Sequence, residues 1–199
     1  VFSIDDQQYI LNKHSKYFEE SDHLLRLNNL IWNKKWGHAR RQLKRVDADY
    51  AKLALAKIKL ARRHYGVDKA VSNVPQELIG VEGLVYERVK WRRRANLRES
   101  SLILLKDFLK NHQISHPDKW WIEINWHARK LLDRNKPDEA YELLKHHQQK
   151  SALNTSNAEW LLGWIALQYL NNAETALIHF LNMNSIVKMP ISMSRANYW

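Results

Sequence analysis

The sequence contains no cysteine, which excludes a disulfide framework and any zinc site built on thiolates. Glycine and proline are scarce, with 5 and 4 residues in a chain of 199. A β-sandwich or β-barrel of this length needs many tight turns, and tight turns consume both residue types. No stretch approaches the roughly 20 consecutive apolar residues of a membrane span. These absences favour long helices joined by short polar connections.

Positive charge is the most prominent property that is present. The formal net charge is +11, and between residues 34 and 63 there are 11 Lys and Arg against two acidic residues, Asp47 and Asp49. A basic surface indicates a polyanionic partner, such as nucleic acid, anionic lipid or an acidic cell-wall polymer. The hydrophobic fraction of 45% and the charged fraction of 27% are ordinary for a globular protein.

Apolar residues recur at helical spacing through most of the chain. Gly66 is expected to cap the C-terminal end of one such helix, and Pro117 to begin another. Thr155 or Ser156 is expected to cap a further helix, with Glu159 completing a capping box. The ranges that predict long helices are 21–32, 47–66, 81–95, 116–135 and 155–172.

Each of these long stretches is followed by a polar turn, a small residue and a second apolar stretch. The small residues are Ala39, Ala70, Ser101, Ala140 and Ala176, with spacings of 31, 31, 39 and 36 residues. Such spacings lie near the 34 residues of tetratricopeptide repeats, in which small residues let paired helices approach closely. We therefore predict an all-α superhelix, or solenoid, of stacked antiparallel helix pairs. It would contain about ten helices in a single domain spanning residues 1–199.

Four segments carry a more specific signal, and they occur in a fixed order. In that order they resemble the superhelical domain of the soluble lytic murein transglycosylases. A less distinctive stretch, VDKAVSNVPQEL (67–78), extends the resemblance, which runs from about residue 25 to the end. The four segments are YERVKWRRR (86–94), WWIEINWHARKLL (120–132), AEWLLGWIAL (158–167) and PISMSRANYW (190–199).

The resemblance implies a role in cell-wall turnover. Members of this family are periplasmic enzymes that cleave peptidoglycan glycan strands to 1,6-anhydromuramyl products. Their helical domain carries a C-terminal, lysozyme-like domain with one catalytic Glu in a Glu-Ser motif, followed by a Gly-Leu-Met-Gln stretch. The chain would thus be a scaffold segment that positions peptidoglycan, with the catalytic domain expected after residue 199. The first residues show no signal-peptide pattern, so periplasmic export would need a signal outside this sequence.

We expect no catalytic residue within this chain. The Glu-Ser pair in the region of the resemblance is Glu99-Ser100, another is Glu20-Ser21 near the start, and no Gly-Leu-Met-Gln stretch occurs. Glu99 fits the first turn of a helix, where the dipole favours negative charge. The same reading applies to the carboxylates Asp138, Glu139 and Glu142, which lie at another predicted helix start. No phosphate-binding glycine loop is present, and we expect no cofactor.

Histidine spacing offers little support for a metal. His112 and His116 stand four apart, but the sequence around them is typical of a helix exit and a loop. His146 and His147 are adjacent, so on a helix they point in different directions. We therefore predict no metal site.

Two groups of residues are candidates for ligand contact. Trp120 and Trp121 are adjacent, so we expect one to be exposed and able to cover the apolar face of a sugar ring. Lys90, Arg93 and Arg94 lie opposite the apolar face of their helix and are predicted to face solvent.

Two other classes of function compete with the transglycosylase scaffold. The first is a free-standing helical-repeat module that binds a protein partner in its concave groove. The second is nucleic-acid binding, which we disfavour because no side-chain code recurs from repeat to repeat.

Overall fold

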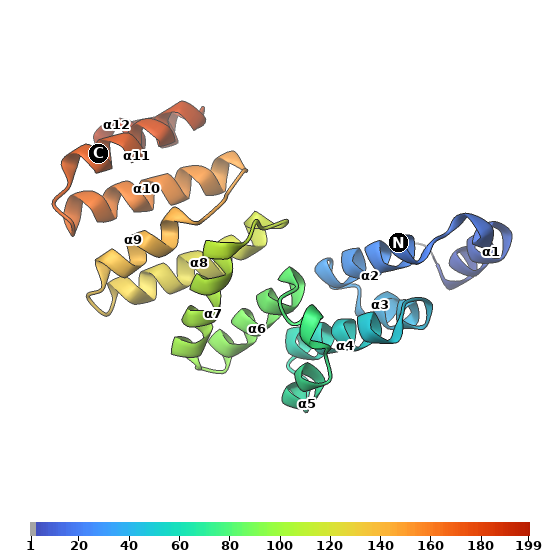
Figure 1. Ribbon diagram of the computed structural model, residues 1–199. Coiled ribbons are helices and arrows are strands. Elements are labelled where there is room, and N and C mark those ends of the chain that lie inside the picture. Colours follow the sequence, from blue (N-terminus) through green and yellow to red (C-terminus); the bar gives the residue numbers. More distant parts are fainter. Residues whose placement is uncertain (1–2) are drawn as a thin grey trace. The chain divides into compact units, whose positions relative to one another are not determined.

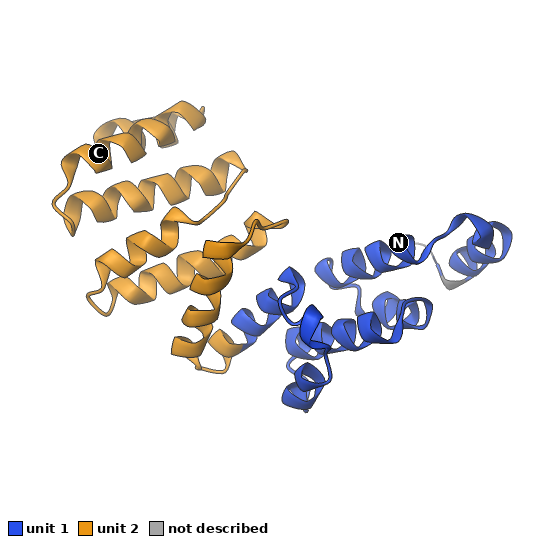
Figure 2. Ribbon diagram, viewed as in Figure 1, with its two compact units in different colours: residues 1–91 blue, residues 92–199 orange. Residues whose placement is uncertain are grey.

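The computed structural model describes residues 3–199, and all regular secondary structure among them is helical (Figure 1). This confirms the predicted all-α class and its solenoid-like arrangement. Twelve α-helices and three short 3₁₀ helices occupy these residues, somewhat more than the ten expected. The chain divides into two compact units, residues 1–91 and 92–199, where we expected one domain (Figure 2). Each unit is described by itself.

Unit 1 begins with α1 and continues in helix pairs. The boundary to unit 2 falls within α6. Its elements are α1 (Ile4–His14), η1 (Ser15–Tyr17), α2 (Glu20–Trp32), α3 (Trp36–Gln42), η2 (Leu43–Arg45), α4 (Ala48–Arg62), α5 (Val67–Ser72), η3 (Gln76–Leu78) and α6 (Glu82–Arg94).

Small and branched apolar side chains form two cores in unit 1. One core joins α2, α3 and α4 and includes Leu27, Ala39 and Ile58. The other joins α4, α5 and α6 and includes Ala70 and Leu84. Because α4 contributes to both cores, neither helix pair could bury its apolar surface alone, as expected of a repeat protein.

Unit 2 repeats the arrangement with longer helices, and α8 to α11 lie side by side (Figure 1). Ala176 and Phe180 of α11 pack with Ala166 of α10 in one of its cores. Gly163 allows this approach, since a Cβ there would meet Phe180 Cε1 at 2.7 Å. Its elements are α7 (Arg98–Asn111), α8 (Pro117–Leu132), α9 (Pro137–Lys145), α10 (Ala152–Gln168), α11 (Ala173–Ile186) and α12 (Pro190–Tyr198).

The turn between the two helices of a pair has the same backbone geometry in several repeats. Lys34, Asn96, Asn135 and Asn171 have φ of 59°, 64°, 54° and 51°. Each lies in the left-handed region, two residues before the second helix begins, and Asn is the residue type that tolerates it best after Gly. In three of these turns the next residue donates its N–H to a carbonyl five residues earlier, at 2.8–2.9 Å, which defines a Schellman motif.

The five predicted small residues occupy one structural position. Each is the fourth residue of a second helix, in α3, α5, α7, α9 and α11, and each donates its N–H to the carbonyl of the residue just before that helix. All five are buried. The repeat deduced from Ala39, Ala70, Ser101, Ala140 and Ala176 is therefore confirmed.

Two predicted helix caps were wrong. Gly66 was predicted to cap the C-terminal end of α4, but the C-cap of α4 is Arg63, with φ of 56°. Gly66 is also in the left-handed conformation, and it is the N-cap of α5. The chain needs a further turn here, and Gly66 supplies it at no steric cost. Likewise α10 begins at Ala152, so Thr155 and Ser156 lie inside the helix and Glu159 is not part of a capping box.

Candidate functional site

The most deeply buried ion pair of unit 2 connects the end of α6 to α8. Arg93 donates from Nε to Glu123 Oε2 at 2.5 Å and from Nη2 to Oε1 at 3.0 Å. The Glu123 side chain is 1% exposed and that of Arg93 is 18% exposed. The guanidinium also lies 5.3 Å from the centre of the Trp126 ring. This two-point contact fixes the register of the two helices.

The predicted solvent exposure of Lys90 and Arg93 was wrong. Lys90 is buried, and its Nζ donates to both carboxylate oxygens of Glu87 at 3.0 and 2.9 Å. The prediction used helical periodicity, which separates the faces of α6. Side chains on nearly all of these faces are covered by packing. Lys90 and Arg93 therefore pair with Glu87 and Glu123 instead of facing water. Arg94 is exposed as predicted, and of these three cations it alone has a freely accessible side chain.

The expectation that Trp120 or Trp121 would be exposed was also wrong, since both are buried. Trp120 stacks on Phe108 of α7 with 5.2 Å between ring centres. Helix α8 also packs against α9 and α10. Residues only about 100° apart around α8 can therefore both be covered by different neighbours. Neither indole offers a free face to a glycan.

Ser101 and His127 form a polar contact within the packing of α7 on α8. Ser101 Oγ lies 3.0 Å from His127 Nε2, and both side chains are buried. Burial, reinforced by the charge of Arg93, lowers the pKa of His127 to about 4. A Ser–His pair acts in nucleophilic catalysis only where substrate reaches the hydroxyl. Here Ser101 is the repeat's small packing residue, and the pair joins two helices.

Of the carboxylates considered for catalysis, Glu99, Glu139 and Glu142 form ion pairs. Glu99 lies in the first turn of α7 and bonds Arg134. Glu139, in the first turn of α9, accepts from Lys106 and Lys136 at 2.7 Å each. These two hydrogen bonds lower the pKa of Glu139 to about 2. A general acid needs the opposite shift, toward neutrality, so this geometry suits helix and surface stability rather than glycoside cleavage.

A hydrogen-bonded chain of Tyr141, His179 and Glu159 links α9, α11 and α10. Tyr141 Oη lies 2.9 Å from His179 Nε2, and His179 Nδ1 lies 2.8 Å from Glu159 Oε2. Although burial alone would raise it, hydrogen bonds from His147, His179 and Asn182 lower the pKa of Glu159 to about 2. Sequence reasoning missed this network, because its members are 18 or more residues apart and only the fold brings them together.

The four histidines examined for metal binding do not come together. His112 ends α7 and stacks on Phe108 with 4.5 Å between ring centres, while His116 precedes α8. This is the helix exit and loop predicted from the sequence. Within residues 3–199, no three His, Cys, Asp or Glu side chains are grouped as metal ligands.

An aromatic cluster lies on α10 and α12, where sequence reasoning proposed no site. Trp160 and Trp164 stack with 6.0 Å between ring centres, and Tyr169 meets Trp164 edge-on at 5.3 Å. Arg195 lies 3.7 Å above the Trp160 ring, and Trp199 is 39% exposed. Trp160 and Trp164 are partly buried, and the parts of such rings that stay exposed beside a cation can pack on the apolar face of a sugar while the cation attracts an acidic group. The four-residue spacing of the two tryptophans was the signal that could have revealed the cluster.

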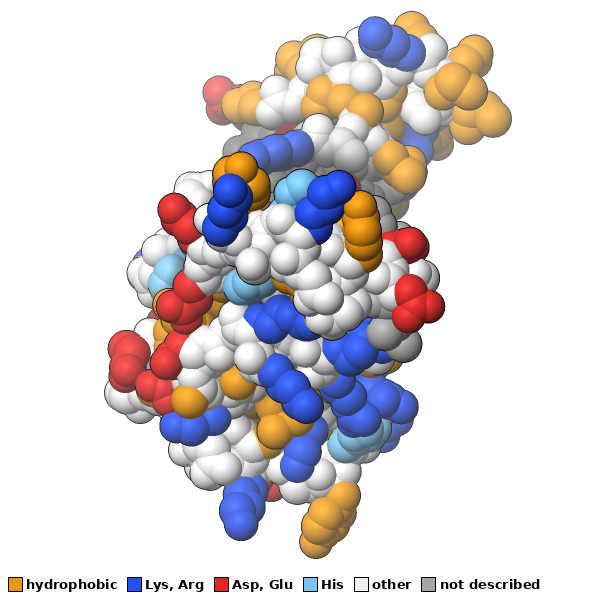
Figure 3. Space-filling model, turned by 90° about the vertical axis from the view of Figure 1, so that its right-hand side faces the viewer, with side chains coloured by type: hydrophobic (Ala, Val, Ile, Leu, Met, Phe, Trp, Pro, Cys, Tyr) orange, Lys and Arg blue, Asp and Glu red, His pale blue; other side chains and the backbone are white. Residues whose placement is uncertain are grey.

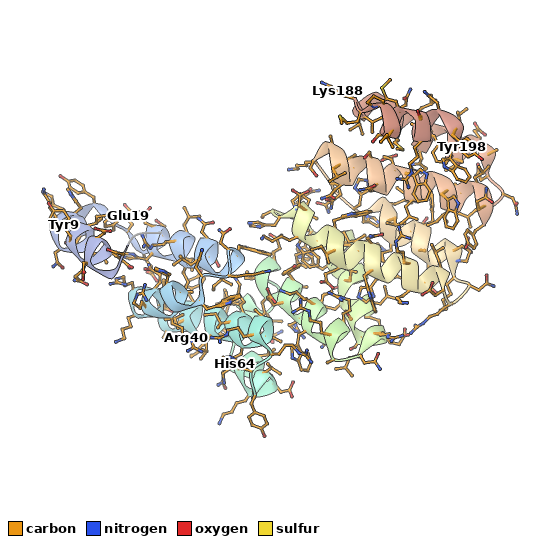
Figure 4. All side chains as sticks on the ribbon, turned by 180° about the vertical axis from the view of Figure 1, so that it is seen from behind. Tyr9, Glu19, Arg40, His64, Lys188 and Tyr198 are labelled. Carbon is orange, nitrogen blue, oxygen red and sulfur yellow. The ribbon has the colours of Figure 1, made fainter. Side chains whose placement is uncertain are left out.

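The basic run 34–63 places exposed cations on unit 1. Lys and Arg side chains are numerous on the face drawn in Figure 3, and Arg40 lies on the outer side of α3 (Figure 4). The exposed members of the basic run 34–63 are Lys34, Lys35, Arg40, Lys44, Lys52, Arg62 and Arg63.

The chain matches no family model, and neither a curated protein nor a solved structure matches it. Across residues 3–199, no helix combines the length and apolar character needed to cross a membrane.

Proposed function

We propose that this chain is a superhelical scaffold segment of a periplasmic lytic transglycosylase. In this role it positions peptidoglycan for an enzyme that cleaves glycan strands to 1,6-anhydromuramyl products, and it contributes no catalytic residue of its own.

The observation that carries this proposal is where the four family-like segments fall. They lie on α6, α8, α10 and α12, which are successive first helices of the pairs. These helices hold Arg93, Glu123 and His127, whose side chains bond a neighbouring helix. They also hold Gly163, where the absence of a side chain makes room for Phe180. That the four most distinctive segments fall at equivalent positions of the repeat is expected of a shared architecture and supports assignment to the family's helical domain.

Surface chemistry supports a wall polymer as the partner. Peptidoglycan carries free carboxylates on its stem peptides and presents sugar rings along its strands. The exposed cations of unit 1 suit the carboxylates, and the cluster of Trp160, Trp164 and Tyr169 suits the rings. Attraction between exposed charges is screened over roughly 8 Å at physiological salt, so we expect weak, salt-sensitive binding.

Co-sedimentation with isolated sacculi tests wall binding. Arg40→Glu/Lys44→Glu removes two exposed cations of unit 1 and should reduce the bound fraction severalfold at low salt. The matched control is Lys110→Glu/Lys150→Glu, which makes the same charge change at exposed positions of unit 2. Wild-type binding by the first variant would contradict the proposal. Equal loss in both variants would show that net charge, not this surface, is responsible. Binding to DNA of similar charge density should be measured as well, to distinguish peptidoglycan binding from binding to any polyanion.

The absence of catalysis is tested on the same sacculi. The purified chain should release no anhydro-muropeptides above a buffer control by mass spectrometry. Release that is lost in Glu99→Gln would show that Glu99 is catalytic. Sequencing the gene downstream would show whether a lysozyme-like domain belongs to the same protein, and cell fractionation would test periplasmic location.

One observation favours the second candidate, a free-standing module that binds a protein. Leu177, Ile178 and Leu181 of α11 are 58%, 54% and 58% exposed, and adjacent apolar side chains of this kind are typical of interaction surfaces. A stop codon directly after Trp199, together with no sacculus binding, would favour this candidate.

A further inference from the structure

Unit 1 contains a cavity of about 610 Å³ lined by α1 and α2, by Asn33 and Lys35 of the turn before α3, and by Gln42 at the end of α3. It lies at the end of the unit marked by Tyr9 and Glu19 (Figure 4). Its volume falls within the roughly 300–1,000 Å³ of small-molecule sites. Exposed Leu25 and Lys35 are among its lining residues, so it opens to the surface.

Two buried amides, Gln42 and Gln7, line this cavity, and Gln42 has hydrogen-bonding capacity to spare. Gln42 is 1% exposed, and its Nε2 donates to the His23 carbonyl at 3.2 Å, but its Oε1 is buried with no hydrogen-bond partner in the described part of the chain. Gln7 of α1 is 7% exposed. A buried acceptor without a donor is destabilising, and a ligand N–H in the cavity would offset this cost.

The remaining lining combines apolar and basic side chains. Leu11, Phe18 and Leu30 supply apolar surface, whereas Arg26 and Lys35 supply positive charge. The lining also includes the Asp22 carboxylate, which accepts the Glu19 N–H at 3.0 Å; with two cations and one carboxylate the lining keeps one excess positive charge. The cavity therefore suits a ligand with a negative group, an apolar part and N–H donors.

We propose that this cavity binds a short peptide through its free carboxylate. The carboxylate faces Arg26 and Lys35, a peptide N–H donates to Gln42 Oε1, and small apolar side chains pack on Leu11 and Leu30. This inference concerns a site in unit 1 and stands whether or not the chain binds cell wall.

Isothermal titration of the full chain tests the proposal with two probes. N-acetyl-alanyl-alanine carries the carboxylate, and N-acetyl-alanyl-alaninamide is its neutral counterpart. The acid should bind saturably and about tenfold more tightly than the amide, as expected for one charge-assisted hydrogen bond. No saturable binding of the acid at millimolar concentration, or equal binding of both peptides, would overturn the proposal.

Variants then locate the site. Lys35→Ala should weaken binding of the acid about tenfold and leave the amide unchanged, whereas the matched change Lys44→Ala, outside the cavity, should alter neither. Gln42→Met should weaken both peptides; Gln7→Leu serves the same purpose if Gln42→Met unfolds the protein. Equal effects of Lys35→Ala and Lys44→Ala, or displacement of the peptide by N-acetylglucosamine alone, would refute a peptide-carboxylate site.

Discussion

The ion pair between Arg93 and Glu123 should be essential to the packing of α8. Glu123 is almost fully buried, so replacing either partner leaves a charge without its counter-charge in a poorly solvated site. Removing one partner of a buried ion pair destabilises proteins by about 3–5 kcal/mol. Because Arg93 keeps some contact with solvent when its partner is removed, we expect about 3 kcal/mol for Glu123→Leu, and slightly more for Arg93→Met, which leaves the buried Glu123 carboxylate unpaired. The double variant should lose only about 1 kcal/mol, since no unpaired charge remains.

Urea unfolding followed by circular dichroism measures these free energies, and thermal unfolding gives a second readout. A loss of 3 kcal/mol corresponds to about 6–12 °C in Tm for a chain of this length. The control is Lys130→Ala, which breaks the exposed pair of Lys130 and Asp133 and should change stability by less than about 1 kcal/mol. The reasoning fails if Glu123→Leu is as mild as this control, or if the double variant loses the sum of both single changes.

Three further predictions concern groups buried in the two units. Burial lowers the pKa of Lys57 from 10.5 to about 8, so the folded state disfavours its charged form and stability should rise between pH 8 and 10.5. Lys57→Met should abolish that rise and stabilise the protein by about 2–3 kcal/mol at pH 7, as measured by urea unfolding. The pKa of His127 is lowered from 6.5 to about 4, so stability is present above pH 6.5 and should fall by about 3 kcal/mol toward pH 4; His127→Leu should flatten this slope. Gly163→Ala should lower stability by about 1–3 kcal/mol, and Phe180→Leu should restore part of the loss by making room for the added methyl; no rescue would contradict the close packing seen here.

The sequence was sufficient to predict the repeat, because its signal is local. A turn, a small residue and an apolar stretch are read within about ten residues, and Ala39 to Ala176 all hold the position that this pattern assigned. Even the left-handed turn residues were readable in part, since Asn96, Asn135 and Asn171 are of the type that tolerates this conformation.

The exposure of individual side chains could not be predicted in the same way. Periodicity indicates which residues share a helix face, but not how many neighbouring helices cover that helix. Lys90 was therefore predicted to face solvent, whereas neighbouring segments cover α6 on nearly all sides and bury it. The burial of Trp121 and the hydrogen bond of Glu159 to His179 could not be predicted for the same reason. Both depend on helices that are distant in sequence.

The Schellman turn determines where a repeat of this protein can tolerate added or deleted residues. Repeat spacing varies from 31 to 39 residues, yet the small residue stays at the fourth position of every second helix. The variation is therefore absorbed by helix length and by the connections between pairs, such as residues 112–116 and 146–151. Residues can be added there without disturbing the reversal that joins two helices, whereas one insertion at residues 133–136 would misplace Ala140. The reversal within a pair is thus fixed in geometry, whereas the connections between pairs tolerate residues of different number while the small residues keep their packing position.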